Sequence, residues 1–277
     1  MKISRLNHSQ EGFSLLEITL AMALAAMLSI GYLYNQTRDQ ALNTTKAQAG
    51  YYLLVNDAVG KYMLTFYDDL SSIPASCSTV LLTAGDAPAA SSASCQFSTG
   101  TKIGSAGPVN AMQPTVAELK KLNMLDNSFN GGFLWSTALV VKKPDGTTPV
   151  TYGTRIKRYC DGQLMTGLGS TCTSKPQYKS ITFNTQPFVA DSNSSFFSLS
   201  RFEKMDTAIA SMGSDGLMSL EPSLDSESKG KLYGVGKQIS LDNPIVYKTP
   251  SVTATDKRGV EGILAVNNSA EVRCTAK

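Results

Sequence analysis

The strongest constraint on this chain is an apolar stretch near its N-terminus, residues 12–34, which reads GFSLLEITLAMALAAMLSIGYLY. Folded as an α-helix, its roughly 22 residues extend about 33 Å, enough to cross the hydrocarbon core of a bilayer. Glu17 is the only charged residue in the stretch. Because a lone carboxylate inside a membrane span is costly, Glu17 is expected to have a positively charged partner.

A small residue, Gly12, lies where the short polar leader meets the apolar stretch. A protease that cuts there would leave Phe13 with a new ammonium group, one helical turn from Glu17. The ammonium group and the carboxylate of adjacent copies would then neutralise each other where lipid or protein excludes water. The pattern therefore predicts a subunit that leaves the membrane by packing helix against helix.

The string GFSLLE at residues 12–17, with a basic leader before it and a 20-residue apolar run after it, resembles the type IV prepilin signature. The resemblance implies that a prepilin peptidase in the membrane cuts after Gly12 and methylates the new N-terminus at Phe13. It also implies that Glu17 is the assembly carboxylate. The expected fold is α+β, with a long N-terminal helix packed on the antiparallel β-sheet of a globular head.

Two plainer interpretations of the same stretch are a secretory signal peptide and a simple signal anchor. Residues 23–25, Ala-Leu-Ala, offer an A-x-A-like site to ordinary signal peptidase. Against a signal peptide, Glu17 would lie inside the apolar region that such a signal requires. A simple anchor has no need of a glutamate.

Charge and histidine content exclude several classes of function. The formal net charge is +3, and the charges are too few and too scattered to indicate nucleic-acid binding. The single histidine, His8, lies in the leader, so the processed chain has no Ser-His-Asp or Cys-His nucleophile and no histidine-ligated metal. The aspartates Asp215, Asp225 and Asp242 fit no calcium loop. We therefore expect no enzyme activity, no catalytic residue, no metal site and no cofactor.

The sequence divides into a leader (1–12), a hydrophobic helix (13–34), an amphipathic half of the same helix (35–68) and a globular head (69–277). In the amphipathic half, an apolar stripe at helical spacing predicts packing against the head: Tyr51, Val55, Ala58, Tyr62 and Phe66. Three glycines, Gly31, Gly50 and Gly60, predict bending or local melting, with Gly31 the softest point.

Capping boxes predict two helices in the head, one opening at Thr115 with Glu118 and ending near Leu125, the other opening at Ser200 with Glu203 and ending at Gly213. The apolar residues of the second helix are expected in the core. Residues 213–244 are polar and turn-rich. Strands are predicted at 134–141, 148–154, 156–160 and 180–189, and a closing hairpin is predicted from 259–266 and 270–274.

The five cysteines leave at least one unpaired within a chain. Lys2 and Arg5 before the span favour a cytoplasmic N-terminus, which places the head where thiols oxidise. Proximity in the sequence favours the disulfides Cys77–Cys95 and Cys160–Cys172. Cys274 is an alternative partner for Cys160 or Cys172, and buried free thiols are a further alternative.

Residues 49–63 and 205–220 loosely resemble the constant region of shufflon-type minor pilins of the type IVb class, which are associated with the tips of conjugative thin pili. This resemblance implies an inner-membrane prepilin that enters an extracellular pilus, with adhesion or recipient-cell recognition as its contribution. Its expected partners are other pilin subunits, the prepilin peptidase, the inner membrane and a receptor on a target cell. A major type IVb pilin and a type II secretion pseudopilin are the alternatives. Phe13 is more usual in type IVa pilins, and the chain is short for a full exchangeable adhesin segment.

Overall fold

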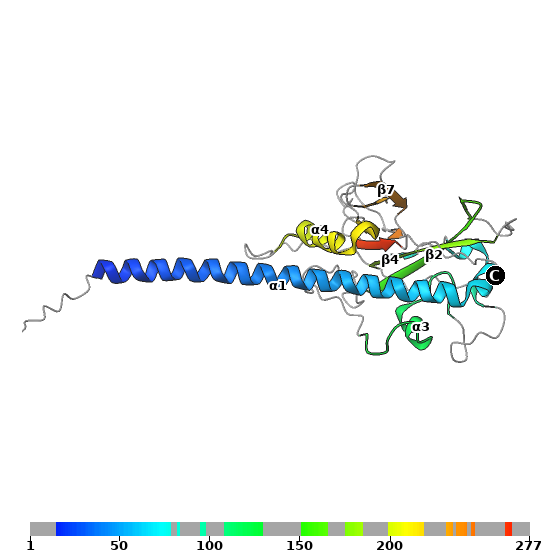
Figure 1. Cartoon of the computed structure of the whole chain (residues 1–277), viewed down its shortest axis with the longest axis horizontal. Coiled ribbons are helices and arrows are strands. Elements are labelled where there is room, and N and C mark those ends of the chain that lie inside the picture. The colour runs from blue at the N-terminus through cyan, green and yellow to red at the C-terminus, as the bar shows by residue number, and fades with distance from the viewer. Residues whose placement is uncertain are drawn as a thin grey trace, which may run out of the picture.

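The protein is an α+β molecule in which one long helix projects from a sheet-containing head (Figure 1). The predicted fold class is confirmed. The computed structural model describes residues 15–78, 82–83, 95–97, 108–129, 151–165, 175–184, 199–218, 231–234, 237–242, 245–246 and 264–267.

Helix α1 runs without a break from Leu15 to Thr65, a length of 51 residues. The predicted local melting at Gly31, Gly50 and Gly60 is wrong, because the helix is continuous through all three positions. Bending at these positions stays a prediction. A single glycine costs about 1 kcal/mol against alanine, which is less than the loss of a turn of backbone hydrogen bonds. Isolated glycines therefore lower the stability of this helix without interrupting it.

The C-terminal half of α1 forms the centre of the hydrophobic core. The predicted stripe is buried at Val55, Ala58, Tyr62 and Phe66, and Tyr51 is partly buried against the core. After α1 the chain turns through the short helix α2 (Tyr67–Ser72) and the 3₁₀ turn η1 (Ala75–Ser78). Helix α3 (Val116–Lys121) lies below α1 in Figure 1, on the side away from the sheet, and ends before the predicted Leu125.

The sheet has seven strands in the order β3-β2-β4-β9-β5-β6-β7, and every neighbouring pair is antiparallel. In sheet order the strands are β3 (Gln163–Leu164), β2 (Tyr152–Cys160), β4 (Gln177–Asn184), β9 (Leu264–Asn267), β5 (Gly216–Met218), β6 (Lys231–Gly234) and β7 (Lys237–Asp242). Strands β1 (Leu82–Thr83) and β8 (Ile245–Val246) form a separate parallel pair.

Strand prediction succeeded for part of the sheet. Strands β2, β4 and β9 overlap predicted strands, whereas residues 134–141 lie outside the described residues. The polar segment 213–244, predicted as turns, contains β5, β6 and β7. The predicted closing hairpin, which would pair residues 259–266 with residues 270–274, is wrong. Strand β9 instead pairs with β4 along one edge and with β5 along the other. These pairings join residues far apart in the chain, which local patterns do not show.

One face of the sheet packs on α1 and on helix α4 (Arg201–Met212), whose predicted capping box is confirmed. Residues opposite one another in register share a face. A row that crosses four strands on this face consists of Thr154, Thr182, Val266 and Gly216. From α4, Met205, Ile209 and Met212 are buried as predicted, and the Phe202 side chain lies outside the described part.

The neighbouring row points to the opposite face of the sheet and is buried as well. It consists of Gly153, Phe183, Ala265 and Leu217, and the last three are at most 1% exposed. These residues belong to no part of the core that surrounds α1. The centre of the sheet is therefore covered on both faces.

Candidate functional site: the exposed apolar helix

The N-terminal half of α1 projects from the head with its apolar side chains uncovered (Figure 1). Between Leu15 and Leu33 the large apolar side chains are 48–82% exposed, and the first buried residue of the helix is Thr45. This segment is long and apolar enough to cross a membrane, and none of its most apolar part is buried. The core helix of a soluble protein can be equally long and apolar, but it is mostly buried, unlike this segment. A signal sequence near the N-terminus has the same length and composition.

Glu17 lies in the first turn of α1 and is exposed. The hydroxyl groups along the segment donate to the helix backbone, Thr19 to Leu16 O at 2.9 Å and Ser29 to Ala25 O at 2.7 Å. The polarity of these hydroxyl groups is therefore satisfied within the helix, and Glu17 is the only charged residue between Leu15 and Tyr34. Gly12 and Phe13, the predicted cleavage and methylation positions, lie outside the described residues.

Where the apolar segment ends, a polar contact joins α1 to α4. Arg38 donates from Nη1 to the hydroxyl of Tyr34 at 3.2 Å, and its Nη2 lies 3.5 Å from Oε1 of Glu203. Both charged side chains are about half exposed, 44% for Arg38 and 45% for Glu203, so the ion pair contributes little to stability. The ion pair matters here because it marks a point of contact between α1 and α4 close to the end of the apolar segment.

Glu203 also completes the cap at the start of α4. The side chain of Ser200 accepts from the Glu203 N–H at 3.2 Å, and the Ser200 N–H donates to the Glu203 carboxylate at 2.9 Å. Backbone and side-chain hydrogen bonds from Ser200, and then the charge of Arg38, lower the pKa of the Glu203 carboxyl below its usual value. The first turn of α4 is therefore held by a charged cap at neutral pH.

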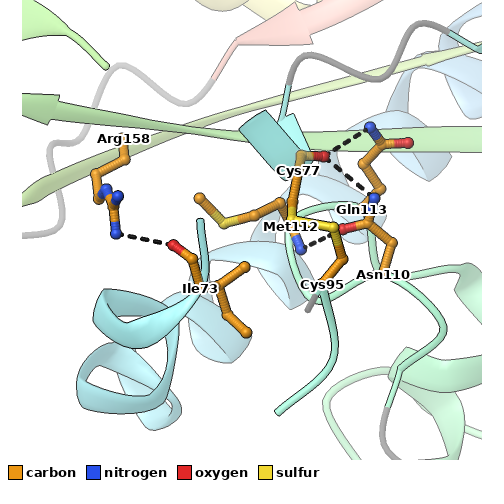
Figure 2. The surroundings of a disulfide bond; sticks show 7 residues. All are labelled: Ile73, Cys77, Cys95, Asn110, Met112, Gln113 and Arg158. Atoms are coloured by element: carbon orange, nitrogen blue, oxygen red, sulfur yellow. Dashed lines mark hydrogen bonds between the residues drawn. A yellow bond between two sulfur atoms is a disulfide. The ribbon is translucent and has the colours of Figure 1, made fainter. Parts of the chain in front are cut away.

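A disulfide between Cys77 and Cys95 is buried beside the C-terminal end of α1 (Figure 2). Its S–S distance is 2.03 Å and its Cα atoms are 5.6 Å apart, which confirms one predicted pairing. Cys160 is also disulfide-bonded, and its partner is not among the described residues. Cys172 and Cys274 both lie outside that part, so the predicted Cys160–Cys172 pairing stays a prediction.

The segment 110–113 ties this disulfide to the sheet. The carbonyl of Cys77 accepts from Asn110 Nδ2 at 3.1 Å and from Gln113 Nε2 at 3.3 Å (Figure 2). The backbone N–H of Ile156 on β2 donates to Met112 O at 2.8 Å. A chain of hydrogen bonds thus links the disulfide to β2, the longest strand of the sheet.

Sequence reasoning missed Arg158, a buried cation on β2 that is 6% exposed. Its Nη1 donates to Ser71 O at 2.9 Å and to Ile73 O at 3.0 Å, which are the carbonyls at the C-terminal end of α2 (Figure 2). A cation there complements the partial negative charge of the helix end. Nothing in the local sequence distinguishes Arg158 from the other basic residues of this strand.

Polar side chains also line the contact between α1 and the sheet. Gln48 is buried and donates from Nε2 to the hydroxyl of Tyr152 at 2.6 Å. The hydroxyls of Ser180 and Thr182 lie 3.5 Å and 3.4 Å from Oδ1 of Asn56, which are long and therefore weak hydrogen bonds. Burial raises the pKa of the Tyr52 and Tyr62 hydroxyls, so these phenols stay neutral. These groups position the helix on the sheet and supply no nucleophile.

In the part of the chain that the structure describes, no group of three or more His, Cys, Asp or Glu side chains is arranged to hold a metal ion. What the fold presents is an α+β head on a helix whose exposed apolar half fits a bilayer. No protein-family model, curated protein or solved structure matches the chain. Function is therefore inferred from its residues and geometry.

Proposed function

We propose that this chain is a type IV minor pilin, made as an inner-membrane prepilin and assembled into an extracellular pilus at or near its tip. The observation that carries the proposal is the division of one unbroken helix. Its C-terminal half is the centre of the head's core, while its N-terminal half is apolar and uncovered. An exposed apolar surface of this size needs lipid or other protein around it.

The GFSLLE string supports a pilin over a permanent membrane anchor. Residues 12–17 match the prepilin signature at the position where the apolar helix begins. An anchor that stays in the bilayer gains nothing from Glu17, whereas a subunit that packs against others can pair this carboxylate with the Phe13 ammonium group of a neighbour. The inner membrane holds the helix first, and other pilin subunits replace the lipid during assembly.

Analysis of the mature N-terminus tests the proposal directly. Mass spectrometry of the protein from cells with a prepilin peptidase should find a chain that begins at N-methylated Phe13. In cells without the peptidase the same protein should keep residues 1–12. A mature chain that begins at Met1, or downstream of Ala25, would contradict the proposal.

Glu17→Ala tests the assembly role of the carboxylate. The variant should be inserted and cleaved normally but should be absent from sheared filaments, because the neighbour's ammonium group loses its partner. Ser29→Ala is a matched control on the same exposed segment, since the Ser29 hydroxyl bonds only to its own helix. Normal incorporation of Glu17→Ala would refute the assigned role.

The minor status and the recognition role rest on the resemblance of residues 49–63 and 205–220 to shufflon-type minor pilins. A minor subunit predicts a faint band in sheared pili and loss of mating or surface attachment on deletion of its gene. A dominant band would instead indicate a major pilin, and blocked release of exoproteins without a surface filament would indicate a pseudopilin.

A further inference from the structure

We infer that, before assembly, the head rests directly on the membrane, with the first turn of α4 and Arg38 inside the phospholipid headgroup layer. This inference depends on the proposed function only for the insertion of α1 into a bilayer. Beyond insertion, it states which surface of the head contacts lipid and why the helix enforces that contact.

The first step is the length of the apolar segment. From Leu15 to Tyr34 the helix rises about 30 Å, which equals the thickness of a bilayer's hydrocarbon core. Tyr32 is 68% exposed and lies with Tyr34 at the end of this segment. Tyrosine is enriched at membrane–water interfaces, so these two side chains mark the boundary of the hydrocarbon.

The second step is the position of Arg38. It lies about 6 Å beyond Tyr34 along the helix, and the headgroup layer on each side of a bilayer is roughly 5–7 Å thick. Arg38 donates to Tyr34 and is 44% exposed, so its guanidinium group retains donors for phosphate or carbonyl oxygens of lipid. The headgroup layer is therefore where Arg38 is placed.

The third step is the contact between Arg38 and α4. Glu203, in the first turn of α4, lies 3.5 Å from Arg38, so the headgroup layer must also contain this turn. Figure 1 shows that α4 reaches further along α1, toward its N-terminal end, than the labelled strands do. Of the labelled elements of the head, α4 is the one that meets the membrane.

The fourth step is the absence of a hinge between membrane and head. Helix α1 is continuous through this junction, from Leu15 to Thr65, and only three residues lie between Tyr34 and Arg38. A head on a continuous helix cannot lift away from the bilayer, and tilting the helix only brings one side of the head closer. Contact with the headgroups is thus a geometric consequence of insertion.

The charges near the contact give no preference for anionic lipid over other phospholipids. Three basic residues, Arg38, Arg201 and Lys204, are accompanied by three acidic residues, Asp39, Glu203 and Asp206, which gives no basic patch. Attraction to anionic lipid requires a cluster of basic residues. We therefore expect the same contact on phosphatidylcholine and on bilayers that contain phosphatidylglycerol, at low and at high salt.

Tryptophan quenching in nanodiscs tests the inference with the full-length chain. In a Trp135→Phe background, Asp206→Trp reports on α4, Thr65→Trp is an exposed control about 40 Å further along the helix axis, and Tyr34→Trp reports on insertion. A headgroup nitroxide lipid should quench Asp206→Trp strongly and Thr65→Trp only at background level. A shallow acyl-chain nitroxide should quench Tyr34→Trp.

The outcomes separate the inference from the proposed function. If Tyr34→Trp is quenched but Asp206→Trp is quenched no more than Thr65→Trp, the helix inserts and the inference is wrong. Failure to quench Tyr34→Trp would contradict insertion itself. Quenching of Asp206→Trp that requires anionic lipid at low salt would also overturn the inference, since it would show charge attraction in place of geometry.

A spacer variant provides a positive control on the mechanism. A flexible Gly-Ser insertion of roughly eight residues between Tyr34 and Asn35 spans about 16 Å and leaves the Arg38–Glu203 pair intact. Quenching of Asp206→Trp should be lost with this insertion and should persist without it.

Where Trp135→Phe reduces folding, photo-crosslinking gives the same comparison in the wild-type background. A photo-crosslinking amino acid is placed at Asp206 or at Thr65, and its lipid adducts are detected by mass spectrometry. Adducts at Thr65 equal to those at Asp206 would count against the inference.

Discussion

Gly216 is a residue where the sheet packs closely against α4. A Cβ added there would lie 2.9 Å from Ile209 O and 3.0 Å from Met212 Cβ. The backbone oxygen cannot move without displacing α4, so Gly216→Ala should destabilise the head by about 1–3 kcal/mol. Gly50→Ala is the matched control, because a Cβ at Gly50 meets nothing within 4 Å.

The control should stabilise the protein by up to about 1 kcal/mol, since alanine favours the helix interior. Chemical denaturation in detergent, followed by circular dichroism, measures both variants against the wild type. If Gly216→Ala destabilises the protein no more than Gly50→Ala does, the close approach of α4 to Gly216 imposes no steric cost.

Arg158 is a second residue whose role is visible only in three dimensions. Arg158→Met leaves Ser71 O and Ile73 O without their charged donor in a buried site, so we expect a loss of about 2–4 kcal/mol. The exposed Arg38 offers a comparison, since Arg38→Met should cost less than about 1 kcal/mol. Thermal unfolding of both variants decides the point, and a small effect of Arg158→Met would mean that water replaces the lost donor.

At the scale of elements, the sequence predicted best those features that are local. The capping boxes at Thr115 and Ser200 and the Cys77–Cys95 disulfide each involve residues close together in the chain, and each is confirmed. The apolar segment of α1 is likewise predictable from composition, because a continuous apolar run of this length is visible in the sequence without knowledge of its partners.

The features that were missed, among them the pairing of β9, depend on distant partners. Strand β9 has four residues, and its central place in the sheet follows from pairing with β4 and β5, which are remote in sequence. Strand β5 has only three residues and lies within a polar segment. The buried Gln48 and Asn56 are polar residues on an otherwise apolar helix face, and their partners Tyr152 and Ser180 lie on the sheet. No local pattern encodes these contacts.

Acid should weaken the start of α4 through Glu203. Its pKa is lowered in the folded protein by the hydrogen bonds from Ser200, so the stabilisation is complete above the unfolded-state pKa and is lost as pH falls through the folded-state pKa. Because the carboxylate is exposed, the effect should be at most about 1 kcal/mol. Hydrogen exchange of α4 amides between neutral pH and pH 3 measures it.

Glu203→Gln supplies the comparison for this titration. The amide oxygen can still accept from the Ser200 N–H, but the group does not titrate, so opening of α4 should lose most of its pH dependence below pH 5. If wild type and variant show the same acid-induced opening, another carboxyl group controls this helix.

Removal of the Cys77–Cys95 disulfide tests how far the head depends on a cross-link. The bridge joins residues 18 apart in sequence, and loss of the corresponding loop entropy should cost about 3 kcal/mol in a Cys77→Ala, Cys95→Ala double variant. Hydrogen bonds from Asn110 and Gln113 to Cys77 O remain available in that variant, so the local fold should persist. Denaturant midpoints of the two proteins give the difference, and unchanged midpoints would refute the estimate.

At the scale of the whole molecule, the protein is two parts that share one helix. The first buried residue of α1 is Thr45, and every residue from Leu15 to Leu33 is exposed. A variant that lacks residues 1–34 should therefore keep the wild-type unfolding transition while losing its need for detergent. A longer deletion through residue 52 removes Gln48 and Tyr52 from the core and should leave no cooperative transition. Circular dichroism melts of the two truncations, with size-exclusion chromatography in buffer alone, measure both outcomes. If the shorter deletion unfolds the head, the exposed segment must contribute contacts to it, and the two parts of the molecule would not be structurally independent.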